Sequence, residues 1–368
     1  MGMADSTTMT LRLVGYFPAG ANAQDYAVAD VPAERLTHLI YAFAGVSADG
    51  ECISLSPAQD RANFPELLTL KKQFPRLKTL ISVGGASNAL HFPTAVSTPA
   101  GRVKLAQSCV QFMKTNGFDG IDVDWEFPGA ADKDNFSALL VELRSALTAE
   151  GRYLLTIAAP AGQSHYENID LAAIHPHLDW INLMTYNFAV TTSQLTNFVA
   201  PLYEAKDDPT ATRASHNVDA AVKAYLAANV PADKVVVGVR FVGTGWQGVT
   251  HVGNGLYQRN GGAAPGTWDK PGSAPSGSLT YQDIEENYLG RYTEFWKNDA
   301  QVPWLYNAAT GIMISYEDEE STGLKADYVL TNGLGGIMVW QLAADDHGHS
   351  LINRISGKFL AKAATAVV

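Results

Sequence analysis

The sequence is short of basic charge. It holds 26 Lys and Arg residues against 37 Asp and Glu residues, a net charge of −11. A protein this acidic binds phosphate backbones and anionic lipid poorly, so we expect neither a nucleic-acid partner nor a membrane partner. No apolar run approaches the roughly 18 residues that a membrane-spanning helix needs, which excludes a transmembrane interpretation of the sequence.

Cysteine is also scarce. Only Cys52 and Cys109 occur. Two cysteines form neither a disulfide framework nor a set of metal ligands, so the fold must be held together by its core. Whether these two residues form one disulfide with each other stays open.

The remaining composition is that of a globular protein. Hydrophobic residues make up 46% of the 368 residues and charged residues 17%. Such a chain can bury a large core, which excludes disorder throughout. Its length exceeds that of a typical domain and leaves two alternatives: one large α/β barrel with an insertion, or two to three smaller domains.

Short β-branched runs alternate with segments of helical periodicity. The eight predicted strands are Leu11–Phe17, Leu36–Phe43, Leu77–Val83, Gly120–Phe127, Tyr153–Ala159, Trp180–Tyr186, Val235–Phe241 and Gly336–Leu342. Apolar spacing near 3.6 predicts helices at Ala100–Asn116, Lys133–Glu150 and Asn217–Asn229. Strands that alternate with helices imply a parallel sheet with right-handed crossovers. Eight such units close into a (β/α)₈ TIM barrel.

The interval between the last two predicted strands is too long for one helix and its loops. Its centre, 261–278, is rich in Gly, Pro and Ser. We therefore predict an inserted α+β subdomain at 246–315, between strands 7 and 8. The catalytic barrel would then comprise 11–245 and 316–368, after a polar N-terminal extension at 1–10.

The segment 118–128 places three acidic residues at alternate positions, Asp122, Asp124 and Glu126. Side chains alternate between the two faces of a strand, so these three share one face and the apolar residues between them share the other. In a barrel we expect the acidic face to point inward and to climb toward the C-terminal end, where active sites of such barrels lie. Pro128 follows closely, which puts Glu126 at the rim.

Three carboxyl groups in a row should not all stay ionised, because burial and like charges raise the pKa of at least one. A carboxylic acid that stays protonated near neutral pH can act as a general acid. An exposed edge strand would also carry alternating acids, but the barrel pattern places this strand inside a closed sheet. A calcium loop of the EF-hand type needs Gly where Phe127 stands, and a strand spaces its carboxylates too widely for one small cation. We therefore expect no metal ion.

The acidic segment resembles a known signature. Asp119, Asp122, Asp124 and Glu126 match the DxxDxDxE motif of family 18 glycoside hydrolases, the chitinases. Three further segments resemble other motifs of that family: Ser82–Gly85 (SxGG), Met184–Asn187 (M-x-Y-D) and Leu334–Trp340 (the eighth strand). The predicted subdomain resembles the chitinase insertion domain, and the likeness extends from about residue 11 to 345.

This resemblance implies a retaining, substrate-assisted hydrolysis of β-1,4 bonds between N-acetylglucosamine units, without a cofactor. Glu126 would protonate the leaving oxygen and later activate water, while the substrate's 2-acetamido oxygen acts as nucleophile. Asp124 would orient the acetamide group, and Asp122 would take up a shared proton. Tyr186 would donate a hydrogen bond to the acetamide oxygen. Asp119 is expected to be structural.

The resemblance also implies a set of substrate-binding residues, with Trp340 as an apolar floor for a sugar ring. The set is Trp340, Asn187, Met184, Tyr16, Phe43, Ser82, Gly84, Gly85 and Arg240. Five aromatic residues of the subdomain could stack on further sugars or form its core, and the sequence does not separate these roles. They are Trp246, Trp268, Tyr281, Trp296 and Trp304.

Two positions depart from the family pattern. Asn187 stands where the family commonly has Asp, and the loss of an anion near Glu126 should lower the pKa of that acid. Arg240 lies on the seventh strand, where relatives often carry Pro. It either contacts a sugar or forms a salt bridge.

The sequence therefore predicts a chitinase that acts on chitin or chito-oligosaccharides. A chitin-binding lectin without catalysis and an endo-β-N-acetylglucosaminidase acting on N-glycans are the alternatives. We expect a monomer that is secreted, although residues 1–10 have neither the basic nor the apolar region of a signal peptide. A removed signal, another export route and a cytoplasmic location all stay open.

Overall fold

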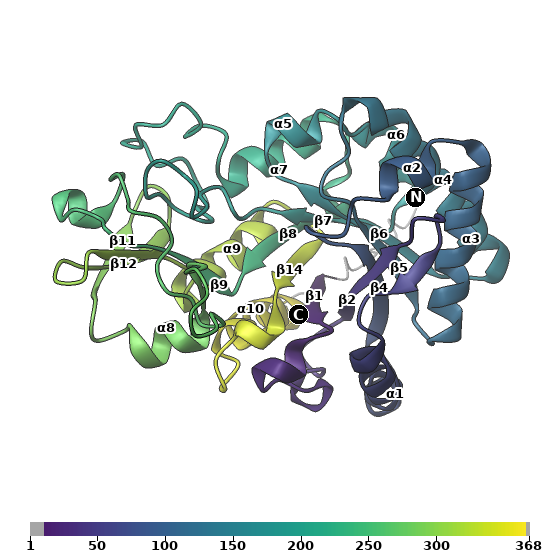
Figure 1. Cartoon of the computed structure of the whole chain (residues 1–368), viewed down its shortest axis with the longest axis horizontal. Helices are drawn as coiled ribbons and strands as arrows, with labels where there is room; N and C mark the ends of the chain where they lie inside the picture. The colour runs from purple at the N-terminus through teal and green to yellow at the C-terminus, as the bar shows by residue number, and fades with distance from the viewer. Residues whose placement is uncertain (1–10, 366–368) are drawn as a thin grey trace.

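The computed structural model describes residues 11–365, so the predicted extension 1–10 lies outside the described residues. Eight parallel strands close into a barrel with helices on its outer side (Figure 1). These strands are β1 (Arg12–Pro18), β2 (His38–Val46), β4 (Lys78–Gly84), β5 (Gly120–Asp124), β6 (Leu154–Pro160), β7 (Trp180–Met184), β8 (Val235–Arg240) and β14 (Gly336–Trp340). The ring closes because β1 pairs with both β2 and β14. The predicted TIM barrel is confirmed.

Helices follow most of the barrel strands. The longer ones are α1 (Pro57–Gln73), α3 (Pro99–Thr115), α4 (Lys133–Glu150), α7 (Val218–Ala227), α9 (Glu319–Thr331) and α10 (Ser350–Thr365). The short ones on the barrel are α2 (Phe92–Val96), α5 (Gln163–Tyr166) and α6 (Leu171–Ile174). The three predicted helices correspond to α3, α4 and α7. The predicted strands agree with the observed ones to within three residues at each end, and β5 ends early, at Asp124.

The barrel has two packed layers, because side chains alternate along each strand. Outward residues such as Val237 and Val239 join a large core against the helices. Inward residues such as Val14, Trp180 and Met338 form a smaller cluster inside the ring. The interior is therefore filled, and space for a ligand remains only above this cluster.

A short strand that the sequence did not reveal, β3 (Cys52–Ser54), pairs antiparallel with β2. It has only three residues, too few for a periodic pattern. Cys52 on β3 and Cys109 on α3 are both buried free thiols, so no disulfide joins them here.

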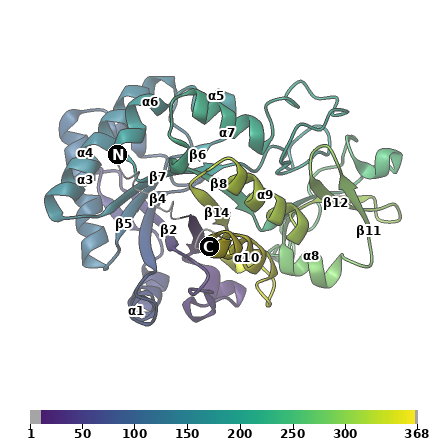
Figure 2. The ribbon, with the colours of Figure 1, turned by 180° about the vertical axis from the view of Figure 1, so that it is seen from behind.

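A second sheet of five strands lies to one side of the barrel (Figure 2). Its strands are β9 (Val242–Trp246), β10 (Ser278–Thr280), β11 (Thr293–Lys297), β12 (Val302–Asn307) and β13 (Ile312–Ser315), and its helix is α8 (Tyr281–Asn287). All of its strand pairs are antiparallel. This is the inserted α+β subdomain expected between the seventh and eighth barrel strands. Because β9 follows β8 almost directly, we propose Val242 as its start in place of residue 246.

Within residues 11–365, no helix has both the length and the apolar character that a bilayer crossing requires.

Candidate active site

The acidic row lies on β5 and just beyond it. Asp122 is completely buried, Asp124 is 4% exposed, and Glu126 lies two residues past the end of the strand. Trp125 points the other way and stacks on Phe92, with ring centroids 5.0 Å apart. The predicted division into an acidic inner face and an apolar outer face is confirmed, although the regular strand stops before Glu126.

Asp122 lies at the centre of a hydrogen-bond network drawn from four other strands. Its Oδ2 accepts from Tyr16 Oη at 2.7 Å and Ser82 Oγ at 2.8 Å. Its Oδ1 accepts from Thr156 Oγ1 at 2.6 Å and Asn182 Nδ2 at 3.2 Å. Burial raises the pKa of Asp122, while these four hydrogen bonds act in the opposite direction because they favour the carboxylate.

Asp124 has the opposite environment. Its buried Oδ1 finds no hydrogen-bond partner among the described residues. Burial, then the charge of Glu126, then that of Asp122 raise the pKa of Asp124 well above its usual value. Burial also raises the pKa of Glu126. The pKa of Asp124 is therefore raised by burial and by both of its neighbours, while the donors at the lower end of the row favour an ionised Asp122.

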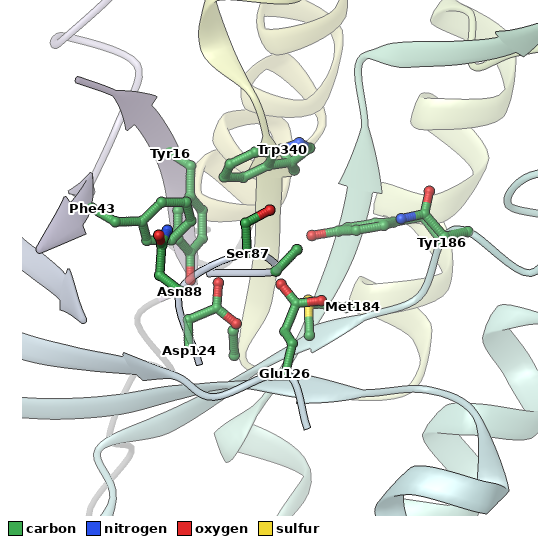
Figure 3. A pocket seen from close by; sticks show the side chains of 12 residues that line it. Tyr16, Phe43, Ser87, Asn88, Asp124, Glu126, Met184, Tyr186 and Trp340 are labelled. Carbon is green, nitrogen blue, oxygen red and sulfur yellow. The ribbon is translucent and has the colours of Figure 1, made fainter. Parts of the chain in front are cut away.

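A cavity of about 250 Å³ opens directly above the acidic row. Figure 3 shows Asp124 and Glu126 pointing into it from one side, with the Trp340 ring across from them and the Tyr186 hydroxyl between. Trp340 packs against Phe43, with centroids 5.8 Å apart. The lining residues are Tyr16, Phe43, Ala86, Ser87, Asn88, Asp124, Glu126, Ala158, Met184, Tyr186, Asn187 and Trp340. An aromatic wall that faces two carboxyl groups suits a sugar ring with a polar edge.

Tyr186 and Asn187 follow β7, at the C-terminal end of the barrel. Tyr186 is 9% exposed, and the one hydrogen bond of its hydroxyl to the described residues goes to a weak acceptor, Met338 Sδ at 3.8 Å. The hydroxyl is therefore available to a ligand. Asn187 is exposed and has φ 60°, a left-handed conformation that Asn adopts more easily than most residues.

The two glycines at the end of β4, Gly84 within the strand and Gly85 directly after it, let neighbouring backbone and rings approach closely. A Cβ at Gly84 would stand 2.1 Å from the Asp124 carbonyl oxygen, and one at Gly85 would stand 2.8 Å from the Phe43 ring. The Gly85 N–H donates to the same Asp124 oxygen at 2.8 Å. These glycines position the acidic strand and the aromatic wall.

The structure sorts the residues predicted to bind substrate into two groups. Tyr16, Phe43, Met184, Asn187 and Trp340 line the cavity, whereas Ser82, Gly84, Gly85 and Arg240 lie around it without lining it. Asp119 forms an ion pair with Lys71, with 2.8 Å between Lys71 Nζ and Asp119 Oδ2, and does not line the cavity.

Sequence reasoning missed four lining residues. Ala86, Ser87 and Asn88 follow directly after Gly85, and that adjacency was the available signal. Nothing in the sequence around Ala158, on β6, indicated that this residue lines the cavity.

The aromatic residues of the insertion subdomain are mostly core. Trp246 is fully buried, and Tyr281 and Trp304 are each 7% exposed. Trp268 and Trp296 are partly exposed. None of the five lines the cavity. In the part of the chain that the structure covers, no group of three or more His, Cys, Asp or Glu side chains is arranged around a metal position.

Comparison with known proteins agrees with this geometry. Residues 12–345 match the family model of glycosyl hydrolases family 18. The chain belongs to glycosyl hydrolase family 18. As a member of this family it is a glycoside hydrolase, and the acidic row on β5 is the family's DxxDxDxE segment.

Curated relatives of this family 18 chain include two bacterial chitinases. Chitinase A1 of Niallia circulans is 35% identical over 91% of this chain. Chitinase B of Serratia marcescens is 34% identical over 89% of it. The chain spans 56% of the first protein and 77% of the second.

Solved structures of family 18 enzymes share the whole fold. Chitinase ChiA74 from Bacillus thuringiensis superimposes with a TM-score of 0.91 at 34% identity, covering 96% of this chain and 70% of that one. A family 18 N-acetylglucosaminidase from Paenibacillus barengoltzii gives a TM-score of 0.83 at 30% identity, with 95% and 100% covered.

Proposed function

We propose that this protein is a chitinase that hydrolyses β-1,4 bonds between N-acetylglucosamine units of chitin or chito-oligosaccharides. The observation that carries the proposal is the buried Asp124 carboxyl group, whose Oδ1 has no hydrogen-bond partner among the described residues and which lies beside Glu126 at the floor of a cavity walled by Trp340. A buried polar group without a partner is costly, so its retention indicates a ligand that supplies the missing bond. The acetamide N–H of the substrate is such a donor.

The proposed reaction has two steps with retained configuration. In the first, Glu126 gives its proton to the glycosidic oxygen, the bond from C1 to that oxygen breaks, and the acetamide carbonyl oxygen forms a bond to C1. In the second, water adds to C1, Glu126 takes the proton of that water, and the bond from the acetamide oxygen to C1 breaks. Asp124 stabilises the positive charge that the acetamide group carries between the two steps.

Three other residues support this chemistry. Burial raises the pKa of Glu126, which favours the protonated form that a general acid needs. Tyr186 donates to the acetamide oxygen and fixes it near C1. Asp122 lies below Asp124 and can take up the proton that the two share, which leaves Asp124 ionised beside the acetamide group; burial raises the pKa of Asp122 while its four donors favour the carboxylate.

Release of a chromophore from a chromogenic chitobioside tests the proposal, with Glu126→Gln as the control protein. A chromogenic cellobioside, which lacks the 2-acetamido group, is the matched substrate control and should not react. Binding of chito-oligosaccharide without turnover would instead identify a lectin. Cleavage of N-glycans in place of the chitobioside would identify an endo-β-N-acetylglucosaminidase.

We also propose that the protein acts as a secreted monomer. Secretion is supported by the insolubility of a polymeric substrate, which an enzyme has to reach outside the cell. Size-exclusion chromatography and assay of the culture medium test the two parts.

A further inference from the structure

Arg240 lies beside the reactive groups without lining the cavity. It is the last residue of β8, and its Cα pairs with Trp340 in the parallel ladder. Val239 belongs to the core on the helix side, so Gly238 and Arg240 face the interior of the barrel. A Cβ at Gly238 would stand 2.9 Å from Tyr186 Cε1, so the tyrosine ring lies against this strand. Arg240 therefore lies one step above that ring on the same face of β8.

The guanidinium group is fixed in place without being neutralised. Its Nη1 donates to Thr244 Oγ1 at 2.8 Å, which is its one hydrogen bond to the described residues. Thr244 is buried and lies on β9, the strand that begins the insertion subdomain. The described residues offer Arg240 no carboxylate ion pair, and burial lowers the pKa of its guanidinium.

Arg144 shows how a purely structural arginine is held in this protein. It forms an ion pair with Asp179 at 2.6 Å and also donates to the carbonyl oxygens of His177 and Tyr153. A guanidinium has five N–H donors, and a charge removed from water is costly unless it is paired. Arg144 meets that requirement, whereas Arg240, which is also partly exposed, makes only one hydrogen bond to the described residues. An unpaired cation beside an active site indicates a functional role.

Tyr186 is the group on which this charge acts. Burial raises the pKa of Tyr186, the carboxyl groups raise it further, and Arg240 is the charge that lowers it. The titratable groups around Tyr186 are Asp122 and Asp124 on β5, Glu126 after it, Tyr16 on β1, and Arg240 on β8. A hydroxyl next to a cation donates a stronger hydrogen bond.

We propose that Arg240 is a positioning residue for the reaction: its guanidinium, held by Thr244 of the insertion subdomain, polarises the Tyr186 hydroxyl that donates to the substrate's acetamide oxygen. This inference rests on the proposed function. It also gives the insertion subdomain a part in catalysis, because the anchor of Arg240 lies on the first strand of that subdomain.

A double-mutant cycle tests the proposal. Arg240→Met, Tyr186→Phe and the double variant are assayed on the chromogenic chitobioside, with kcat and KM determined separately. We expect Arg240→Met to lower kcat about 10-fold in the wild-type background and less than about 2-fold in the Y186F background, with little effect on KM. Arg240→Lys should restore part of the loss, because it keeps the charge. Thr244→Val should show a smaller loss.

Arg144→Met is the matched control, and we expect it to lower stability without coupling to Tyr186. Equal effects of Arg240→Met in both backgrounds, or a change confined to KM, would overturn the proposal and make Arg240 a substrate contact or a structural residue. An unchanged kcat would overturn it as well. Absence of any activity in the wild-type protein would refute the proposed function instead, so the two failures are distinguishable.

Discussion

Two of the places where the protein buries carboxyl groups provide opposite environments for them. Glu317 is 2% exposed, forms an ion pair with the fully buried Lys325, and accepts from Ser321 Oγ at 2.6 Å. Lys325 donates in addition to the Ala200 carbonyl oxygen at 2.7 Å. Asp124 is buried almost as deeply, yet its neighbouring charges are carboxyl groups and its Oδ1 has no partner among the described residues.

This difference distinguishes a buried ion pair that serves the stability of the fold from carboxyl groups that serve the proposed reaction. Glu317 and Lys325 satisfy each other, so their burial connects the returning end of the insertion to α9 and to the loop after β7. Asp124 Oδ1 has no hydrogen-bond partner within residues 11–365, at a place where a cavity opens, and a substrate can supply the missing bond. Replacing the carboxyl group by an amide should therefore lower the activity when it is made at Glu126 and lower the stability when it is made at Glu317.

The largest expected effect is that of Glu126→Gln. Without the general acid, kcat/KM on the chromogenic chitobioside should fall by about 10²- to 10⁴-fold. The free energy of unfolding, measured in urea, should stay the same or rise slightly, because one of several like charges is removed. Retention of most of the activity would contradict the role given to Glu126.

The same change at the other place, Glu317→Gln, should leave kcat/KM of the folded protein unchanged and lower its stability. Lys325 would stay buried without a counter-charge, which costs about 3–5 kcal/mol. Urea unfolding measures the loss. In the control, Glu317→Leu combined with Lys325→Met should recover most of it, because it removes both charges. An unfolding curve equal to that of the wild type would show that the pair contributes nothing.

A second comparison uses two buried tyrosines, Tyr186, which lines the cavity, and Tyr225, which does not. Tyr186→Phe should lower kcat about 10- to 100-fold, because the lost hydrogen bond is one to a group that becomes charged. Tyr225 is fully buried and its hydroxyl donates to the Pro160 carbonyl at 2.7 Å. Tyr225→Phe should cost about 1 kcal/mol of stability and spare kcat. The reverse pattern would refute the assignment of Tyr186.

The smallest expected effect is a shift in pH dependence. The general acid must be protonated, so the rate falls as pH rises through the pKa of Glu126. Asn187→Asp adds an anion at the cavity, which raises that pKa, and the alkaline limb of the kcat profile should move to higher pH by on the order of one unit. Asn332→Asp, at the opposite end of the barrel, should cause no shift. A limb that stays in place in both variants would contradict the prediction.

Local patterns predicted most of the fold. The β-branched runs placed the eight barrel strands, since a strand buried on both faces is recognisable without knowing its neighbours. The alternation of Asp122 and Asp124 with apolar residues gave the inner face of β5 correctly, because the period of a strand is a local property. The same pattern overestimated the strand by three residues, since Glu126 leaves the ladder at the rim.

Contacts between distant elements were beyond that reasoning. Ser82, Asp122 and Thr156 lie at one level because β4, β5 and β6 pair in a particular register. The burial of Trp246 and Trp304 depends on how the second sheet packs, so the sequence could not separate core aromatics from sugar-binding ones. Ser87 and Asn88 line the cavity from the loop after β4, and the course of a loop has no periodic sequence pattern that would predict this.

By itself the sequence determined which carboxyl groups face the barrel interior and in what order, because backbone geometry fixes the alternation. The tertiary structure alone decided that Asp122 is saturated and Asp124 is left free. The donors to Asp122 come from positions 34 to 106 residues away along the chain, and only closure of the ring brings them to one carboxylate. Hydrogen bonds act over about 3 Å, so their distribution is set by the fold and not by spacing in the sequence.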